Sequence, residues 1–193
     1  MMGRVTELPP PRDLERPLPD LVAELAARLG EAPVVSLCVG LLQGADREQH
    51  LAELPYLTGL SFERGSPRRD PTSWADHWVR SWGARGLLYV WDESASAAVV
   101  EGLADGHWRP AEMCLKVATR REVGGAGDGA VVLSTHELPR VRSQAVRTLG
   151  AVGDTEHVAA VRDRLDDDVA DVRRQAGRAL ERLVTRLDLV DGR

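Results

Sequence analysis

The chain has 193 residues, 43% of them hydrophobic, and a formal net charge of −5 at pH 7. That length suits one ordinary domain or one short repeat array, and it is sufficient for a buried core. The longest apolar run, Val34 to Leu42, is too short to span a bilayer, and the proline-rich start shows no apolar signal region. We therefore expect a cytoplasmic protein with no membrane association.

The basic residues are almost all arginine: Lys116 is the only lysine, and the chain contains no Ile and no Asn. This bias is typical of codon choice in a GC-rich bacterial genome, so the abundance of arginine is poor evidence for nucleic-acid binding. From Arg140 onward, 11 arginines are interspersed with 10 acidic residues, a pattern that indicates solvated, salt-bridged helix faces.

The N-terminal third predicts helices without a repeat. Residues 1–17 are proline-rich and predict a flexible tail, and residues 18–70 predict helices followed by a loop. Helical spacing of apolar residues predicts a helix over 18–29 that Gly30 ends, then a buried helix from Pro33 to Leu42. Asp46 is a candidate N-cap for a third segment that reaches Leu54, and the stretch 55–71 is interpreted as a mobile loop.

The remaining chain contains an internal repeat. The order Val79-Arg80-Ser81 recurs as Val141-Arg142-Ser143, and 12 of the 27 positions in 79–105 and 141–167 are identical at an offset of 62. Half that offset leads to Val172-Arg173, so the unit is about 31 residues long, a period typical of stacked helical repeats. The predicted repeat array, 71–187, comprises repeats at 71–105, 106–138 and 139–168 and a capping half-repeat at 169–187, before a tail at 188–193.

Within these repeats the spacing predicts particular helices. Ser73 with Asp76 resembles a capping box that opens a helix running to about Val90, and Asp92 is expected to cap a second helix that reaches Leu103. The second repeat is degenerate, with Met113 and Val117 expected on its core side. Its glycine-rich stretch 124–129 predicts a flexible loop before a short helix at 130–133. Four residues are expected to form the inner face of the half-repeat: Ala176, Leu180, Leu183 and Leu187.

The run 139–154, PRVRSQAVRTLGAVGD, followed by Val172-Arg173-Arg174-Gln175-Ala176, resembles bacterial HEAT repeats, and in particular the short type named after phycobilisome lyase subunits. The resemblance is specific over 139–186, good over 77–105, weak over 106–138 and absent over 1–70. It implies an all-α fold, a short α-solenoid of HEAT-like helix pairs with an N-terminal helical extension. It also implies a concave surface offered to another macromolecule, and no catalytic residues.

Charged residues that recur with the repeat predict a structural ladder between neighbouring repeats, with a phosphate-binding stripe as the alternative. The arginines recur near the start of the first helix in the first repeat, the third repeat and the half-repeat, and the aspartates recur at the turns within and between repeats. The ladder comprises Arg80, Asp92, Asp105, Arg142, Asp154, Asp167 and Arg173.

Three tryptophans unique to the first repeat suggest a contact surface. Trp74, Trp78 and Trp82 share one helix face with Tyr89 and Arg85, about 135° from the expected core face of Val79, Gly83, Leu87 and Val90 at about 100° per residue. The face could pack on the N-terminal helices 18–54. Alternatively, it could be an exposed patch for a partner, with Arg85 available for a cation–π contact.

No pattern in the sequence indicates catalysis. The five histidines lack the spacing of a zinc site, the glycine-rich stretch lacks the features of a phosphate loop, and Cys38 and Cys114 suggest buried thiols of a reduced compartment. We therefore expect no enzyme activity, no cofactor and no metal.

The expected function is that of a scaffold or adaptor that binds another protein, through the concave helix surface near Glu101 or through the aromatic patch. The protein is expected to be a monomer or a weak oligomer. One alternative is a DNA-repair glycosylase of the HEAT-like type. It is disfavoured because the expected concave helix 94–104 carries Glu101 and no basic residue, which makes a nucleic-acid partner unlikely. A second alternative is an accessory subunit of a lyase or a chaperone-like subunit.

Overall fold

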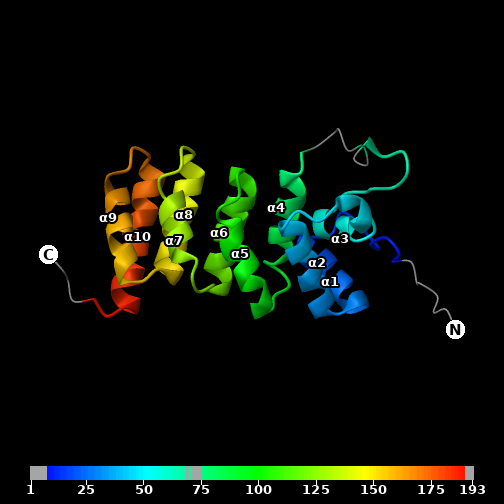
Figure 1. Ribbon diagram of the computed structural model, residues 1–193, viewed down its shortest axis with the longest axis horizontal. Coiled ribbons are helices and arrows are strands. Elements are labelled where there is room, and N and C mark those ends of the chain that lie inside the picture. The colour runs from blue at the N-terminus through cyan, green and yellow to red at the C-terminus, as the bar shows by residue number, and fades with distance from the viewer. Residues whose placement is uncertain (1–7, 68–69, 71–74, 190–193) are drawn as a thin grey trace. The chain divides into compact units, whose positions relative to one another are not determined.

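The computed structural model describes residues 8–67, 70 and 75–189. These residues form α-helices and short 3₁₀ helices, and none of them lies in a β-strand. The chain divides into two compact units, 1–92 and 93–193, which we describe separately (Figure 1). The predicted class, an all-α fold of HEAT-like helix pairs, is confirmed.

The first unit contains α1 (Leu18–Leu29), α2 (Glu31–Leu42), a 3₁₀ turn (Arg47–His50), α3 (Leu54–Thr58) and α4 (His77–Gly86). The second unit contains a 3₁₀ turn (Glu93–Ala95), α5 (Ser96–Gly102), α6 (Trp108–Arg121), α7 (Gly127–Leu133) and α8 (Pro139–Val152). It continues with a 3₁₀ turn (Thr155–His157), α9 (Val158–Asp163), a 3₁₀ turn (Arg164–Asp166) and α10 (Ala170–Arg186).

The first two helices meet at Gly30, which has the positive φ of +95° that glycine adopts without strain. The chain bends there by 118°, so α1 packs back on α2. The second helix begins at Glu31, two residues before the expected Pro33, because a proline in the first helical turn needs no backbone N–H partner. No single helix in the described residues is long and apolar enough to cross a membrane; α1 and α2 pass that test only as a bent pair.

The expectations for the segments 8–17 and 55–71 of the first unit were wrong. The stretch 55–71 is not one loop, because Pro55 lies in the first turn of α3, a helix that sequence reasoning missed. Of the expected tail, residues 1–7 lie outside the described residues, but Pro11 is buried and the hydroxyl of Tyr56 donates a hydrogen bond of 2.8 Å to the carbonyl of Pro9. The segment 8–17 is thus part of the fold of the first unit.

The fourth helix packs against α2 at very short range. A Cβ built on Gly83 would lie 2.5 Å from the carbonyl oxygen of Cys38 and 2.5 Å from the nitrogen of Leu42, and one on Gly86 would lie 2.4 Å from the Cys38 sulfur. The absence of side chains at these two positions therefore allows α4 to approach α2. Gly83 was expected to face the second helix of its own repeat, and this expectation was wrong: it faces α2.

In the second unit, α6, α8 and α10 are the first helices of successive repeats, and α5, α7 and α9 are the second helices. Within this unit α6 packs on α8, α8 packs on α10, and each second helix packs on the first helix that follows it (Figure 1). Their apolar contacts are fully buried, as at Val141, Leu149 and Leu183. Burying a side chain of this size contributes roughly 2 kcal/mol, so the packed faces stabilise the stack.

The degenerate repeat differs in detail from its prediction. Cys114 and Val117 are fully buried, whereas the expected Met113 is half-buried, so the core register lies one residue later at that turn. Only the first half of the glycine-rich stretch 124–129 is a loop, because α7 already begins at Gly127. In α10 the fully buried positions are Val172, Ala176 and Leu183, while Leu180 and Leu187 are half-buried.

Candidate interaction surfaces

The aromatic stripe is largely internal to the first unit. Trp82 is 8% exposed, and its ring meets that of Phe62 edge to face at a centroid distance of 6.1 Å. Trp78 is half-buried, with its ring 6.5 Å from that of Trp82. Trp74 lies outside the described residues. The contact of Trp82 comes from the segment 55–71 and not from the expected partner 18–54, and it makes Trp82 internal to the first unit.

The two other members of the stripe also face inward. The Arg85 guanidinium donates a hydrogen bond of 2.7 Å to the carbonyl of Leu57, and burial lowers its pKa from the usual value. Tyr89 is half-buried and lines a depression with alanines of α1, among them Ala23 and Ala26. Arg85 therefore holds α4 to the end of α3.

The repeat ladder is best seen at the start of α8. The guanidinium of Arg142 donates hydrogen bonds of 2.8 Å from Nε and Nη2 to the two carboxylate oxygens of Asp167, and Nη1 donates to the carbonyls of His136 and Glu137 at 3.1 Å. Both side chains are nearly buried, with 10% and 2% exposed. These hydrogen bonds from Arg142 lower the pKa of Asp167 to about 2.

Arg173 occupies the same place in α10, and donates to the carbonyls of Asp167 and Asp168. The turn position itself repeats: Asp105, His136 and Asp167 each accept a hydrogen bond from the backbone N–H two residues later. Such side-chain-to-backbone bonds fix the turn that precedes each first helix.

The second repeat lacks both partners of the ladder. Ala111 stands 31 residues before Arg142, and His136 stands 31 residues before Asp167. The arginine and the carboxylate are thus replaced together, which leaves no buried charge unpaired there. The ladder predicted from the sequence accordingly contains no residue of the second repeat, 106–138.

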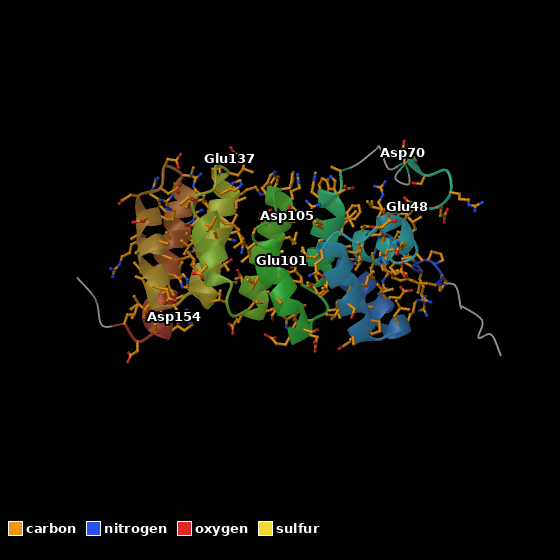
Figure 2. The ribbon with its side chains drawn as sticks, in the orientation of Figure 1. Glu48, Asp70, Glu101, Asp105, Glu137 and Asp154 are labelled. Carbon is orange, nitrogen blue, oxygen red and sulfur yellow. The ribbon has the colours of Figure 1, made fainter. Side chains whose placement is uncertain are left out.

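The remaining ladder aspartates act as caps or lie at the boundary between the units. Asp154 accepts a hydrogen bond from the backbone N–H of Thr155, and its own N–H donates to Nδ1 of His157. Asp92 is exposed, and Arg80 is half-buried at the fourth residue of α4. In Figure 2, Asp154 and Glu137 lie towards opposite ends of the helices of the second unit. The turns within and between repeats therefore carry separate sets of polar residues.

Charge is segregated between the two kinds of helix in the second unit. The first helices α6, α8 and α10 contain twelve basic and three acidic residues, whereas the second-helix segments 93–102, 127–133 and 155–166 contain two basic and six acidic residues. Glu101 is exposed on α5 (Figure 2). Charges that are interspersed in the sequence therefore lie on different helices in space, because first and second helices alternate along the chain.

Both cysteines and His157 have structural roles. Burial raises the pKa of Cys38 to about 12 and raises that of Cys114 as well, and both thiols are free and buried. His157 packs on Gly127, where an added Cβ would lie 2.4 Å from the imidazole. Among the described residues, no three His, Cys, Asp or Glu side chains form a group that could hold a metal ion.

Comparison with known proteins supports the helical-repeat class. Residues 130–182 match a family model described as HEAT repeats, so this part of the chain is similar to HEAT-repeat proteins. The crystal structure of an engineered protein, a target of the Northeast Structural Genomics Consortium, is 19% identical with a TM-score of 0.52, over 89% of this chain and 86% of that one. No curated protein matches the chain. The likeness to the engineered protein concerns the fold alone.

Proposed function

We propose that this chain is a non-catalytic helical-repeat scaffold that binds another protein. The observation that carries the proposal is the segregation of charge in the second unit, where the first helices are basic and the second helices acidic. Stacked helical repeats bind macromolecules through extended surfaces. One basic and one acidic face, each extending over several repeats, suit such binding.

The buried polar residues of α8 support this interpretation because they bond within the scaffold. The hydroxyl of Thr148 lies 2.9 Å from that of Thr119, and its single proton is donated to the carbonyl of Gln144 at 3.0 Å or to that of Leu115 at 3.1 Å. The hydroxyl of Ser143 donates to the carboxylate of Asp171. These buried polar groups thus maintain the fold, and recognition is assigned to the residues that remain exposed.

The alternative of a DNA-repair glycosylase is not favoured. Such an enzyme needs a basic channel on the second-helix side, and α5 with its preceding turn contains Glu93 and Glu101 and no basic residue. An accessory role beside a lyase or a chaperone rests on the type of repeat alone. A bacterial, cytoplasmic protein remains our expectation from composition.

The test is affinity purification of the full chain from its native cells, followed by quantitative mass spectrometry. Three variants address three surfaces: Glu101→Arg on the second-helix side, Trp78→Ala on the aromatic stripe, and Arg147→Glu with Arg178→Glu on the first helices. Arg64→Glu, at an exposed position of the first unit, is the control.

We expect the wild-type chain and the control to recover the same protein, and one surface variant to lose it while retaining its helical circular dichroism and melting temperature. Equal recovery with all three folded variants would contradict the proposal. Conversion of a small-molecule substrate by the purified chain would contradict its non-catalytic part.

A further inference from the structure

The exposed stripe of α8 consists of arginine. Of the fourteen residues of this helix, all of them described, Arg140 and Arg147 alone are exposed. They are seven residues apart, which places them on the same side of the helix, two turns from each other. No acidic residue occurs in α8. The surface that the central first helix presents to solvent is thus purely cationic.

The neighbouring first helices place a basic residue in the same register. Lys116 in α6, Arg147 in α8 and Arg178 in α10 are spaced by 31 residues, the repeat length. The helices α6, α8 and α10 pack side by side (Figure 1). The shared register therefore places these three residues in a row across the helices. Arg120 lies one turn beyond Lys116 in α6, and Arg182 lies one turn beyond Arg178 in α10. We define the basic face as Lys116, Arg120, Arg140, Arg147, Arg178 and Arg182.

Intramolecular pairing neutralises only part of the basic face. Glu112 accepts a bidentate contact from Arg140 at 2.9 Å and an ion pair from Lys116 at 3.1 Å, so these three residues keep one net positive charge. Arg140 also lies over the ring of Trp108, with its guanidinium carbon 4.8 Å from the ring centroid. The contacts of Glu112 and Trp108 hold this cation in a fixed position.

The outer part of the face has no such partner. Within the described residues, the guanidinium groups of Arg120, Arg147, Arg178 and Arg182 form no ion pair, and all four side chains are exposed. Four like charges gathered on one side repel one another, at a small cost in water that an anionic partner removes. The basic face is therefore complementary to carboxylates or phosphates.

We propose that the basic face binds an acidic helical segment of a partner protein, laid across α6, α8 and α10. This inference rests on the proposed function and names the chemistry of the partner. Packed helices lie about 10 Å apart, so successive cations of the row are separated by roughly that distance. Seven residues of an α-helix rise about 10 Å, so carboxylates repeated every seven residues in the partner match the row.

The charge of the whole chain favours a protein over a nucleic acid. The chain carries a net charge of −5, and the second unit itself contains 17 acidic and 15 basic residues. A long polyanion therefore meets repulsion beyond the basic face, whereas a helix of about three heptads covers that face alone. At physiological salt the charges interact over only about 8 Å, so contact with a matched acidic patch dominates.

The probe is a fluorescent helical peptide of three heptads with glutamate pairs repeated every seven residues, titrated into the full chain and followed by anisotropy. A matched peptide carries glutamine in place of glutamate. The test variant is Arg147→Glu with Arg178→Glu. Its control, Arg64→Glu with Arg162→Glu, makes the same change in net charge at two exposed positions outside the basic face.

We expect the glutamate peptide to bind, the glutamine peptide not to bind, and the test variant to weaken binding on the order of tenfold or more while the control changes it little. Higher salt should weaken binding to the wild type. Equal binding by the two variants, or equal binding of the two peptides, would overturn the proposal.

Two competing ligands are tested in parallel, a duplex of 20 base pairs and vesicles rich in phosphatidylserine. If either binds more tightly than the peptide and is lost in the test variant, the basic face serves phosphates and the proposal is wrong. Sedimentation that shows a self-association lost in the same variant would likewise assign the face to a second copy. A third outcome separates this inference from the proposed function. If the glutamate peptide does not bind, but the Glu101→Arg variant no longer recovers the partner protein, this inference is wrong and the scaffold function still stands.

Discussion

Arg142, at the start of α8, and Asp167, in the turn that follows the same repeat, form a bidentate ion pair. Within the described second unit, no other first helix forms such a pair with the turn after its repeat. The two N–O distances are both 2.8 Å, and the pair is almost closed to solvent. Because the guanidinium also caps the carbonyls of His136 and Glu137, Arg142 joins the turns on both sides of α8.

Replacement of Arg142 by alanine should therefore destabilise the protein strongly. The change leaves the buried carboxylate of Asp167 with only the longer ion-pair contact of 3.7 Å to Arg164, which costs about 3 kcal/mol or more in the free energy of unfolding. Urea unfolding followed by circular dichroism measures the change. Arg147→Ala on the same helix, at an exposed position, should cost less than about 0.5 kcal/mol, and similar losses for both variants would contradict the structural role of Arg142.

The same pair predicts how stability depends on acid. Arg142 lowers the pKa of Asp167 from 3.8 to about 2, so the folded state binds this proton less readily than the unfolded state. The stabilisation, on the order of 2 kcal/mol, is fully present above pH 4 and is lost as the pH falls towards 2. Unfolding free energies of the wild type and Asp167→Asn should thus converge between pH 4 and pH 2. A constant difference over that range would refute the assignment, and Asp163→Asn, at an exposed position, is the control.

The repeat architecture was predictable because identical residues recur at a fixed offset. The helix 18–29 was predicted from its apolar spacing and from Gly30 at its end, and the recurring residues located the repeat 139–168 that α8 opens. The helix α3 was missed because proline and glycine on both sides of Leu57 resemble a loop in sequence, although Pro55 fits the first turn of a helix.

The candidate surfaces were less predictable. The spacing of Trp78 and Trp82 placed them on one face correctly, but the burial of Trp82 depends on Phe62, which no periodicity connects to it. The basic face was missed for a physical reason. Arginine and acidic residues alternate along the chain, and only the alternation of first and second helices separates them in space.

Close packing at Gly83 predicts a strong effect of a single methyl group. In Gly83→Ala, the new Cβ would meet backbone atoms of Cys38 and Leu42 at 2.5 Å, and backbone cannot move aside as a flexible side chain does. We expect a loss of about 2 kcal/mol or more in the free energy of unfolding.

Gly177 offers the matched control for this prediction. It lies inside α10, where an added Cβ would meet no atom within 4 Å. Gly177→Ala should therefore leave stability unchanged or raise it by up to about 1 kcal/mol through helix propensity. Thermal unfolding of both variants decides the matter, and equal melting temperatures would show that α4 does not approach α2 as described.

Restoration of the ladder in the degenerate repeat is the most specific prediction. Ala111 and His136 stand where the next repeat has Arg142 and Asp167, and Asp105 already supplies the turn that precedes α6. Ala111→Arg alone buries a cation without a carboxylate, and His136→Asp alone adds a carboxylate without a cation. Each single change should therefore destabilise the protein, by about 1 to 3 kcal/mol.

The double variant should recover much of that loss, because the two new side chains can repeat the bidentate pair of Arg142 and Asp167. A double-mutant cycle measured by urea unfolding should give a favourable coupling of about 1 kcal/mol or more. As a control, Ala111→Arg combined with Asp163→Asn pairs the cation with a change at a remote exposed residue, and should show no coupling. Additive losses in the Ala111→Arg, His136→Asp variant would show that the second repeat no longer has the geometry of the third.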